Sequence, residues 1–248
     1  MLRIMKGRFL ELWDWLQKPV GQRLLVHEQA AVSERLSANF GIQGLEVGWW
    51  GDLGQFVADA QVRQHHWVSP IFWQGVDLMS WPRALGVRSD SADVLVLPHT
   101  LELTDDPHAM LREAHRILVG DGTLIILAFN PHSLWGLQRG IWRGRFPPGL
   151  ARFLSPAQIR EWFKLLGIDL VEQRPYCFGA PFGGQRWQDW WSRKEQAHTR
   201  WPSWLAGAYL LMGRKRVYST VTLRGLGKKR HRRRLAGSIV EPSTNQRG

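Results

Sequence analysis

SADVLVLPHTLELTDDPHAMLREAHRILVGDGTLIILAF, residues 91–129, contains two uninterrupted apolar runs on either side of one amphipathic segment. The runs, Val94–Leu97 and Leu124–Phe129, have the length of strands and no polar alternation, which is typical of strands buried on both faces. Between them, Asp106-Pro107 supplies an N-cap and a proline at the first helical position, and Gly120-Asp121-Gly122 ends the helix. Because parallel strands need such a crossover, the stretch predicts a βαβ unit and an α/β fold with helices covering a parallel sheet.

Upstream of this unit the chain changes from helical to strand-like patterning. Apolar residues such as Phe9 and Trp13 recur at roughly helical spacing, so residues 1–40 are predicted to form a helical segment ahead of the domain. Leu45–Gly48 is short, apolar and β-prone, and glycines follow it from Gly51 onward. We therefore expect the first strand here, with a glycine-bearing turn after it.

Downstream, the same signals predict one more helix and two more strands. Ser155-Pro156 begins a helix that Gly167 ends, and Ile168–Cys177 is predicted to be the next strand. The final strand is expected within Tyr209–Leu223, which is rich in β-branched and aromatic residues. The domain is thus predicted to span residues 41–226.

Two long excursions and a tail complete the predicted organisation. The excursions, at about 130–155 and 178–207, are rich in tryptophan and arginine, and we expect the first to be a mobile crossover or lid. Residues 227–248 are basic and then polar, with little apolar surface to bury, so disorder is predicted there.

Composition places the chain among folded soluble proteins. Its 248 residues are 44% hydrophobic and 22% charged, and Cys177 is the single cysteine, which excludes an intramolecular disulfide framework and a Cys-rich metal site. The N-terminus lacks the apolar run of a signal peptide, and no run is long enough to span a bilayer. These features predict a cytoplasmic protein.

The basic charge predicts contact with polyanions rather than a specific partner. Lys228–Arg234 contributes half of the formal net charge of +12, and such a run would bind nucleic acid or an anionic membrane weakly and without sequence specificity. Several of the 15 tryptophans lie with arginines in the two excursions. They could stack on bases, sit at a membrane interface, or simply pack the excursions.

The chain resembles the class I S-adenosylmethionine-dependent methyltransferases, of the type 11-like group, over residues 42–132. The elements that carry the resemblance come in chain order: Glu46-Val47-Gly48, Gly51, Gly54, Asp77-Leu78, Ser91–Val96, His99–Glu102, Asp106-Pro107, Leu111-Arg112-Glu113, Arg116-Ile117-Leu118, Gly120-Asp121-Gly122 and Leu124-Ile125-Ile126. The run Asn130–Leu137 is shared with a group of uncharacterised proteobacterial methyltransferase-domain proteins. The resemblance implies a bacterial protein with a Rossmann-like sheet and an antiparallel final strand.

The same resemblance implies a cofactor, S-adenosylmethionine, and the residues that hold it. Glu46 and Gly48 would line its methionine and ribose side, Asp77-Leu78 its adenine side, and Leu97–His99 the floor below the sulfonium. The implied cofactor-binding residues are Glu46, Gly48, Gly51, Asp77, Leu78, Leu97 and His99. Because ligands of open α/β sheets bind beyond the strands' carboxyl ends, His99 is also the candidate general base, with a structural histidine as the alternative.

Two positions depart from the family pattern. Trp50 stands where the family normally has glycine, and the end of the second strand, His65–Pro70, has no carboxylate for the ribose hydroxyls. We expect no metal at His65-His66, because adjacent residues on a strand point to opposite faces.

The function expected from these observations is S-adenosylmethionine-dependent methyl transfer to an unidentified small-molecule or macromolecular acceptor. A first alternative is a non-catalytic descendant of the fold whose loop at Trp49 and Trp50 has lost the cofactor and which binds RNA or a protein. A second is a membrane-surface methyltransferase that acts on a lipid-like substrate.

Overall fold

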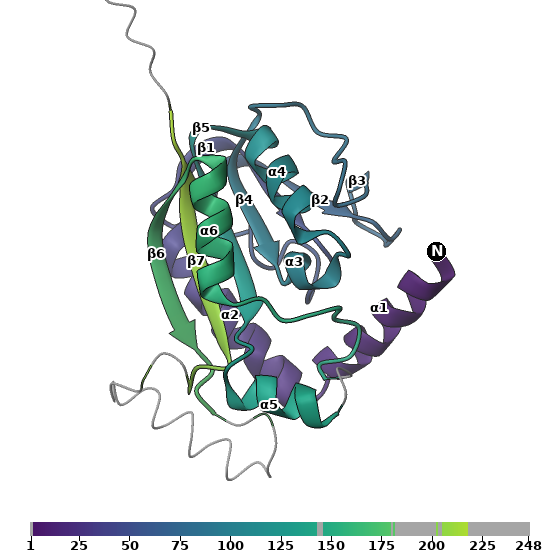
Figure 1. Cartoon of the computed structure of the whole chain (residues 1–248). Coiled ribbons are helices and arrows are strands. Elements are labelled where there is room, and N and C mark those ends of the chain that lie inside the picture. Colours follow the sequence, from purple (N-terminus) through teal and green to yellow (C-terminus); the bar gives the residue numbers. More distant parts are fainter. Residues whose placement is uncertain (1, 143–145, 180, 182–201, 203–204, 218–248) are drawn as a thin grey trace, which may run out of the picture. The chain divides into compact units, whose positions relative to one another are not determined.

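Seven strands of the described residues form one sheet in the order β3-β2-β1-β4-β5-β7-β6 (Figure 1). The structure is a computed structural model that describes residues 2–142, 146–179, 181, 202 and 205–217. Neighbouring strands from β3 to β5 pair in parallel, and β7 pairs antiparallel with both β5 and β6. The strands are β1 (Phe40–Val47), β2 (Gln61–Ser69), β3 (Leu78–Met79), β4 (Ala92–Pro98), β5 (Leu118–Phe129), β6 (Ile168–Tyr176) and β7 (Ala208–Lys215). The predicted α/β class and antiparallel final strand are confirmed.

Helices cover both faces of this sheet. They are α1 (Leu2–Leu16), α2 (Pro19–Leu36), α3 (Thr100–Leu103), α4 (Pro107–Ile117), α5 (Leu134–Ile141) and α6 (Pro156–Leu166). In Figure 1, α4 and α6 lie on the near face and α2 on the far face. Side chains alternate along β4 accordingly, because Leu95 and Leu97 pack with α4 and α6 whereas Val94 and Val96 pack with α1 and α2.

The N-cap signals of the sequence operate as predicted, but one stop signal does not, because α4 ends at Ile117 and Gly120-Asp121-Gly122 lies within β5. The Asp106 carboxylate accepts a hydrogen bond of 2.9 Å from the backbone N of Ala109 at the start of α4. The hydroxyl of Ser155 accepts one of 3.2 Å from the backbone N of Gln158 at the start of α6, which Gly167 ends with a φ of 71°.

The first two crossovers differ from an ordinary doubly wound sheet. Residues 48–60 join β1 to β2 and residues 70–77 join β2 to β3, and both contain turns but no helix. Without crossover helices, one face of the sheet is covered by the N-terminal helices instead. Leu24 and Val32 of α2 share one core with Phe56 and Val57 of the first crossover. The helical segment predicted at 1–40 is therefore part of the domain core.

Other boundaries also differ from the sequence-based expectation. The final strand ends at Lys215, within the range predicted for it, and residues 218–223 lie outside the described residues. The first excursion contains α5 and the buried side chains of Trp135, Phe146 and Leu150, and its description as a mobile crossover or lid stays a prediction. Most of the second excursion and the whole of 227–248 lie outside the described residues.

The chain divides into one compact unit, Met1–Val217, and a second, Tyr218–Gly248, which falls outside the described residues. No helix in the described part of the chain is both long and apolar enough to cross a membrane.

Candidate functional site

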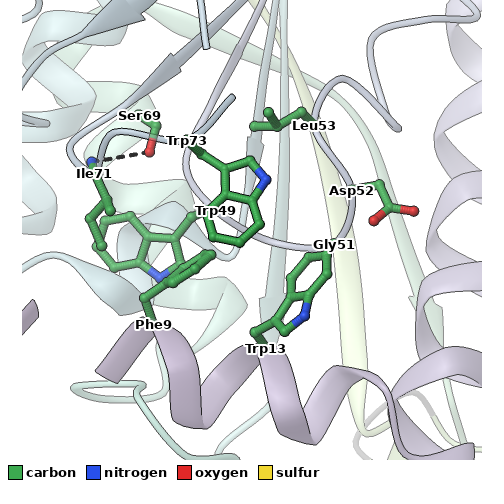
Figure 2. Close-up of a pocket in the computed structure, with 9 residues that line it drawn as sticks. All are labelled: Phe9, Trp13, Trp49, Gly51, Asp52, Leu53, Ser69, Ile71 and Trp73. Carbon is green, nitrogen blue, oxygen red and sulfur yellow. Dashed lines mark hydrogen bonds between the residues drawn. The ribbon is translucent and has the colours of Figure 1, made fainter. Parts of the chain in front are cut away.

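Two cavities lie at the carboxyl edge of the parallel strands, where open α/β sheets bind ligands. The first, the loop cavity, has a volume of about 160 Å³ and is lined by Gly51, Asp52 and Ser69 together with aromatic side chains. Figure 2 shows Phe9 and Trp13 projecting from α1 toward Trp49 and Trp73 around this space. The α1 helix therefore forms one wall of the candidate site.

The second, the Leu103 cavity, has a volume of about 340 Å³. Its lining comes from the segment after β3, with Trp81 and Pro82, and from Leu103–Asp105 at the end of α3. Trp49 lines both cavities.

The glycine loop after β1 is covered by the protein's own side chains. Three of its glycines, Gly48, Gly51 and Gly54, have φ of 141°, 71° and 72°, which favours glycine at each position. A β-carbon at these positions would meet the side chains of Thr100, Gln55 and Trp67, respectively. The loop backbone thus offers no open cradle in this arrangement.

Glu46 lies at the end of β1 and holds the loop. It is buried, and its carboxylate accepts hydrogen bonds from the backbone N of Phe56 at 3.0 Å and of Val57 at 3.2 Å. Burial raises the pKa of Glu46 to about 8 despite these bonds. Its carboxylate is engaged with the chain, and a cofactor role for it stays a prediction.

His99 is fully buried at the end of β4, and both ring nitrogens have carboxylate partners. Nδ1 lies 2.6 Å from Oε2 of Glu102, and Nε2 lies 2.8 Å from Oε1 of Glu28 on α2. Burial lowers the pKa of His99, but the two glutamates outweigh that effect and raise it to about 9. In this arrangement the ring is buried and both nitrogens have partners, which favours the structural alternative, and the general-base role of His99 stays a prediction.

Trp50 packs directly on this histidine. The two ring centroids are 4.0 Å apart, and Phe129 lies on His99 at 4.3 Å. The indole is 1% exposed, and its Nε1 donates a hydrogen bond of 2.7 Å to Oε2 of Glu28. Tyr176 donates a further bond of 2.9 Å to Oε1 of the same carboxylate. We call Glu28, Trp50, His99, Glu102 and Tyr176 the Glu28 network.

Sequence reasoning missed three members of this network. Glu102 could have been found, because it lies three residues after His99 and the short α3 brings the two together. Glu28 and Tyr176 are 71 and 77 positions from His99 in the sequence, and no local pattern marks either of them.

The remaining predicted residues lie apart from the two cavities. Asp77 is exposed, and its carboxylate accepts a hydrogen bond of 2.9 Å from the backbone N of Trp67. Leu97 is fully buried in the core beside α4, and Leu78 packs against that same core. Of the seven predicted cofactor residues, Gly51 lines the loop cavity, and the other six line neither cavity.

Strand β2 ends at Ser69, within the segment that has no carboxylate in the sequence. Ser69 lines the loop cavity, and its hydroxyl accepts a hydrogen bond of 3.2 Å from the backbone N of Ile71. The carboxylate on this cavity is that of Asp52, and the buried Nε1 of Trp49 has no hydrogen-bond partner among the described residues.

The fold is that of the Rossmann-like methyltransferases. Similar solved structures include a SAM-dependent methyltransferase from Thermotoga maritima, with 19% identity, a TM-score of 0.63, and coverage of 87% of this chain and 100% of that one. A SAM-dependent methyltransferase from Archaeoglobus fulgidus has 14% identity and a TM-score of 0.53, over 75% of this chain and 94% of that one.

The sequence comparison gives the family. The methyltransferase domain profile matches residues 31–173, more than half of the chain, so the protein belongs to the methyltransferase domain family. It is also 37% identical over 98 residues to the uncharacterized protein YafS of Escherichia coli (strain K12). That match spans 39% of this chain and 40% of YafS.

S-adenosylmethionine is the cofactor expected of this family and these structural neighbours. In the arrangement described, the residues around the loop do not fit it. Trp50 and His99 fill the space beyond β1 and β4, and side chains cover the glycines. The loop cavity, at about 160 Å³, is also smaller than the roughly 300–1,000 Å³ of ordinary ligand pockets.

Proposed function

We propose that the protein transfers a methyl group from S-adenosylmethionine to an acceptor, and that Trp49 and Trp50 must leave the sheet edge before the cofactor binds. Membership of the methyltransferase family supports the reaction class. The observation that carries the second part is the place of Trp49, which is buried and lines two cavities at the edge where this fold binds ligands.

The two tryptophans differ in what holds them. Trp49 is buried with an unpartnered indole N–H, so moving it breaks no hydrogen bond of that group among the described residues. Trp50 is held by Glu28 and by the stack on His99. Moving the Trp50 indole therefore costs more free energy than moving the Trp49 indole. Because both costs are subtracted from the binding free energy, we expect the wild-type affinity for the cofactor to be weak.

A second candidate function is favoured by Trp50 itself. An indole that is 1% exposed and hydrogen-bonded to a buried carboxylate is an ordinary core residue. A protein that never opens this position would keep the methyltransferase fold without the cofactor and would act as a binding protein.

Calorimetric titration with S-adenosylmethionine and with S-adenosylhomocysteine separates these candidates. We expect both Trp49→Ala and Trp50→Gly to bind the cofactor at least tenfold more tightly than the wild type, because each removes an indole that competes with the ligand. Trp142→Ala is the matched control, since that tryptophan is exposed and lines neither cavity.

Far-UV circular dichroism must show that each variant is folded, because removing a buried tryptophan costs about 3–5 kcal/mol. Trp49→Ala keeps the test valid if Trp50→Gly does not fold. Absence of binding at millimolar ligand, in the folded wild type and in folded Trp49→Ala, would reject the cofactor-dependent proposal in favour of the binding protein.

A further inference from the structure

The Leu103 cavity has the size and the lining of a ligand site. Its volume of about 340 Å³ lies within the range of small-molecule pockets, roughly 300–1,000 Å³. Its walls are mainly apolar, with Trp49 and Leu103 buried and the indole of Trp81 42% exposed at the surface. An exposed indole beside an apolar cavity is a surface on which a flat or aliphatic group can pack.

Two arginines give this apolar cavity a positive rim. Arg8 reaches it from α1 and Arg83 from the segment after β3, and both residues are exposed. Within the described residues, neither guanidinium forms a hydrogen bond or an ion pair with another side chain. Asp105 is the one carboxylate among the described lining residues, so the charged groups of these residues carry a net positive charge.

One nearby carboxylate, that of Asp106, offsets part of this charge but does not line the cavity. Asp106 is used as the N-cap of α4, and its pKa is lowered chiefly by the hydrogen bond from Ala109 and further by the charges of Arg83 and Arg112. A guanidinium that is not already paired can bind a carboxylate, sulfonate or phosphate through charge-assisted hydrogen bonds.

We propose that the Leu103 cavity binds an apolar molecule that carries one anionic group, with its apolar part against Trp81 and Leu103 and its anion at Arg8 and Arg83. If this cavity is the acceptor site, such a molecule is the class of substrate that the proposed methyltransferase methylates. That assignment rests on the proposed function. Binding of such a molecule does not depend on the cofactor, and it can be measured without it.

The test uses two fluorescent probes with the same ring system and the full-length protein without cofactor. The probes are 1-anilinonaphthalene-8-sulfonate, which is anionic, and N-phenyl-1-naphthylamine, which is neutral. We expect the anionic probe to bind at one site per chain, and the neutral probe to bind at least tenfold more weakly.

Two variants locate that binding site. Arg8→Gln combined with Arg83→Gln should weaken binding of the anionic probe at least tenfold and leave the neutral probe unchanged. Ala84→Trp, which places a large ring on the cavity lining, should weaken both probes. Arg63→Gln combined with Arg88→Gln is the charge-matched control, because both of these arginines are exposed and line neither cavity.

Equal affinity for the two probes, or unchanged binding of the anionic probe in the Arg8/Arg83 variant, would overturn the inference. Neither result bears on the titration with S-adenosylmethionine, which reports on Trp49 and Trp50. If the protein binds the anionic probe here but no cofactor, the ligand site stands and the proposed methyl transfer is rejected. If it binds the cofactor but not the anionic probe, the proposed methyl transfer stands and the ligand site is rejected.

Discussion

Replacing Glu28 with glutamine is expected to lower the free energy of unfolding by about 3–5 kcal/mol. The Glu28 side chain is 0% exposed and accepts hydrogen bonds from Trp50, His99 and Tyr176. Glutamine has one carbonyl oxygen and one amide NH₂ group, so at least one of these donors would face another donor. The substitution would also remove a buried negative charge beside the His99 imidazolium.

Urea unfolding followed by circular dichroism measures this effect. Glu34→Gln is the matched control, because Glu34 is an exposed glutamate on the same helix, and we expect its unfolding midpoint to stay close to that of the wild type. A double-mutant cycle with Trp50→Phe, which lacks the indole N–H, should recover part of the loss, since Phe removes one of the stranded donors. Equal midpoints for Glu28→Gln and Glu34→Gln would show that the Glu28 network contributes little to stability.

Stability is expected to fall as the pH rises from about 6.5 to about 9. The pKa of His99 is about 9 in the folded protein against 6.5 ordinarily, so the folded state binds the proton more tightly than the unfolded state. The stabilisation is fully present below pH 6.5 and is lost as the pH rises through 9, and this pKa difference corresponds to about 3 kcal/mol. The groups that face the ring are Glu28 and Glu102, with Tyr176 beyond Glu28.

Two other buried acids act in the same direction at lower pH. Burial raises the pKa of Glu46 to about 8, and burial also raises that of Glu102. A carboxyl whose pKa is raised on folding stabilises the protein below its ordinary pKa of 4.5 and ceases to do so above its folded value. The pH dependence therefore extends from weakly acidic to weakly alkaline conditions, and the His99 contribution occupies its upper end.

Urea unfolding at pH 6, 7.5 and 9 measures the slope in the wild type and in His99→Gln. The variant is uncharged at that position, and we expect it to be less stable at pH 6 and to lose part of the slope between pH 7.5 and 9. A wild-type free energy of unfolding that stays constant from pH 6.5 to 9 would contradict a protonated His99 inside the network.

The central βαβ unit could be predicted because its signals are local. Asp106-Pro107 and the apolar runs around them lie within 39 residues, and the structure places β4, α4 and β5 on those segments. The absence of a carboxylate at the end of β2 could also be predicted, because it depends only on which residues occupy positions 65–70. By contrast, the two helix-free crossovers could not be foreseen, because turn residues such as Gly51 and Gly54 mark a turn without saying whether a helix follows.

The sequence by itself determined the α/β class, the parallel sheet and the edge at which it binds ligands. The reason is that strand periodicity and helix caps depend on residues close together in the chain. Only the tertiary structure decided what fills that edge. Glu28 comes from a helix that precedes β1, yet it meets Trp50 and His99 at the end of β1 and β4. These contacts depend on how α2 packs across the sheet. There Trp50, His99 and Glu28 are buried together as one hydrogen-bonded part of the core.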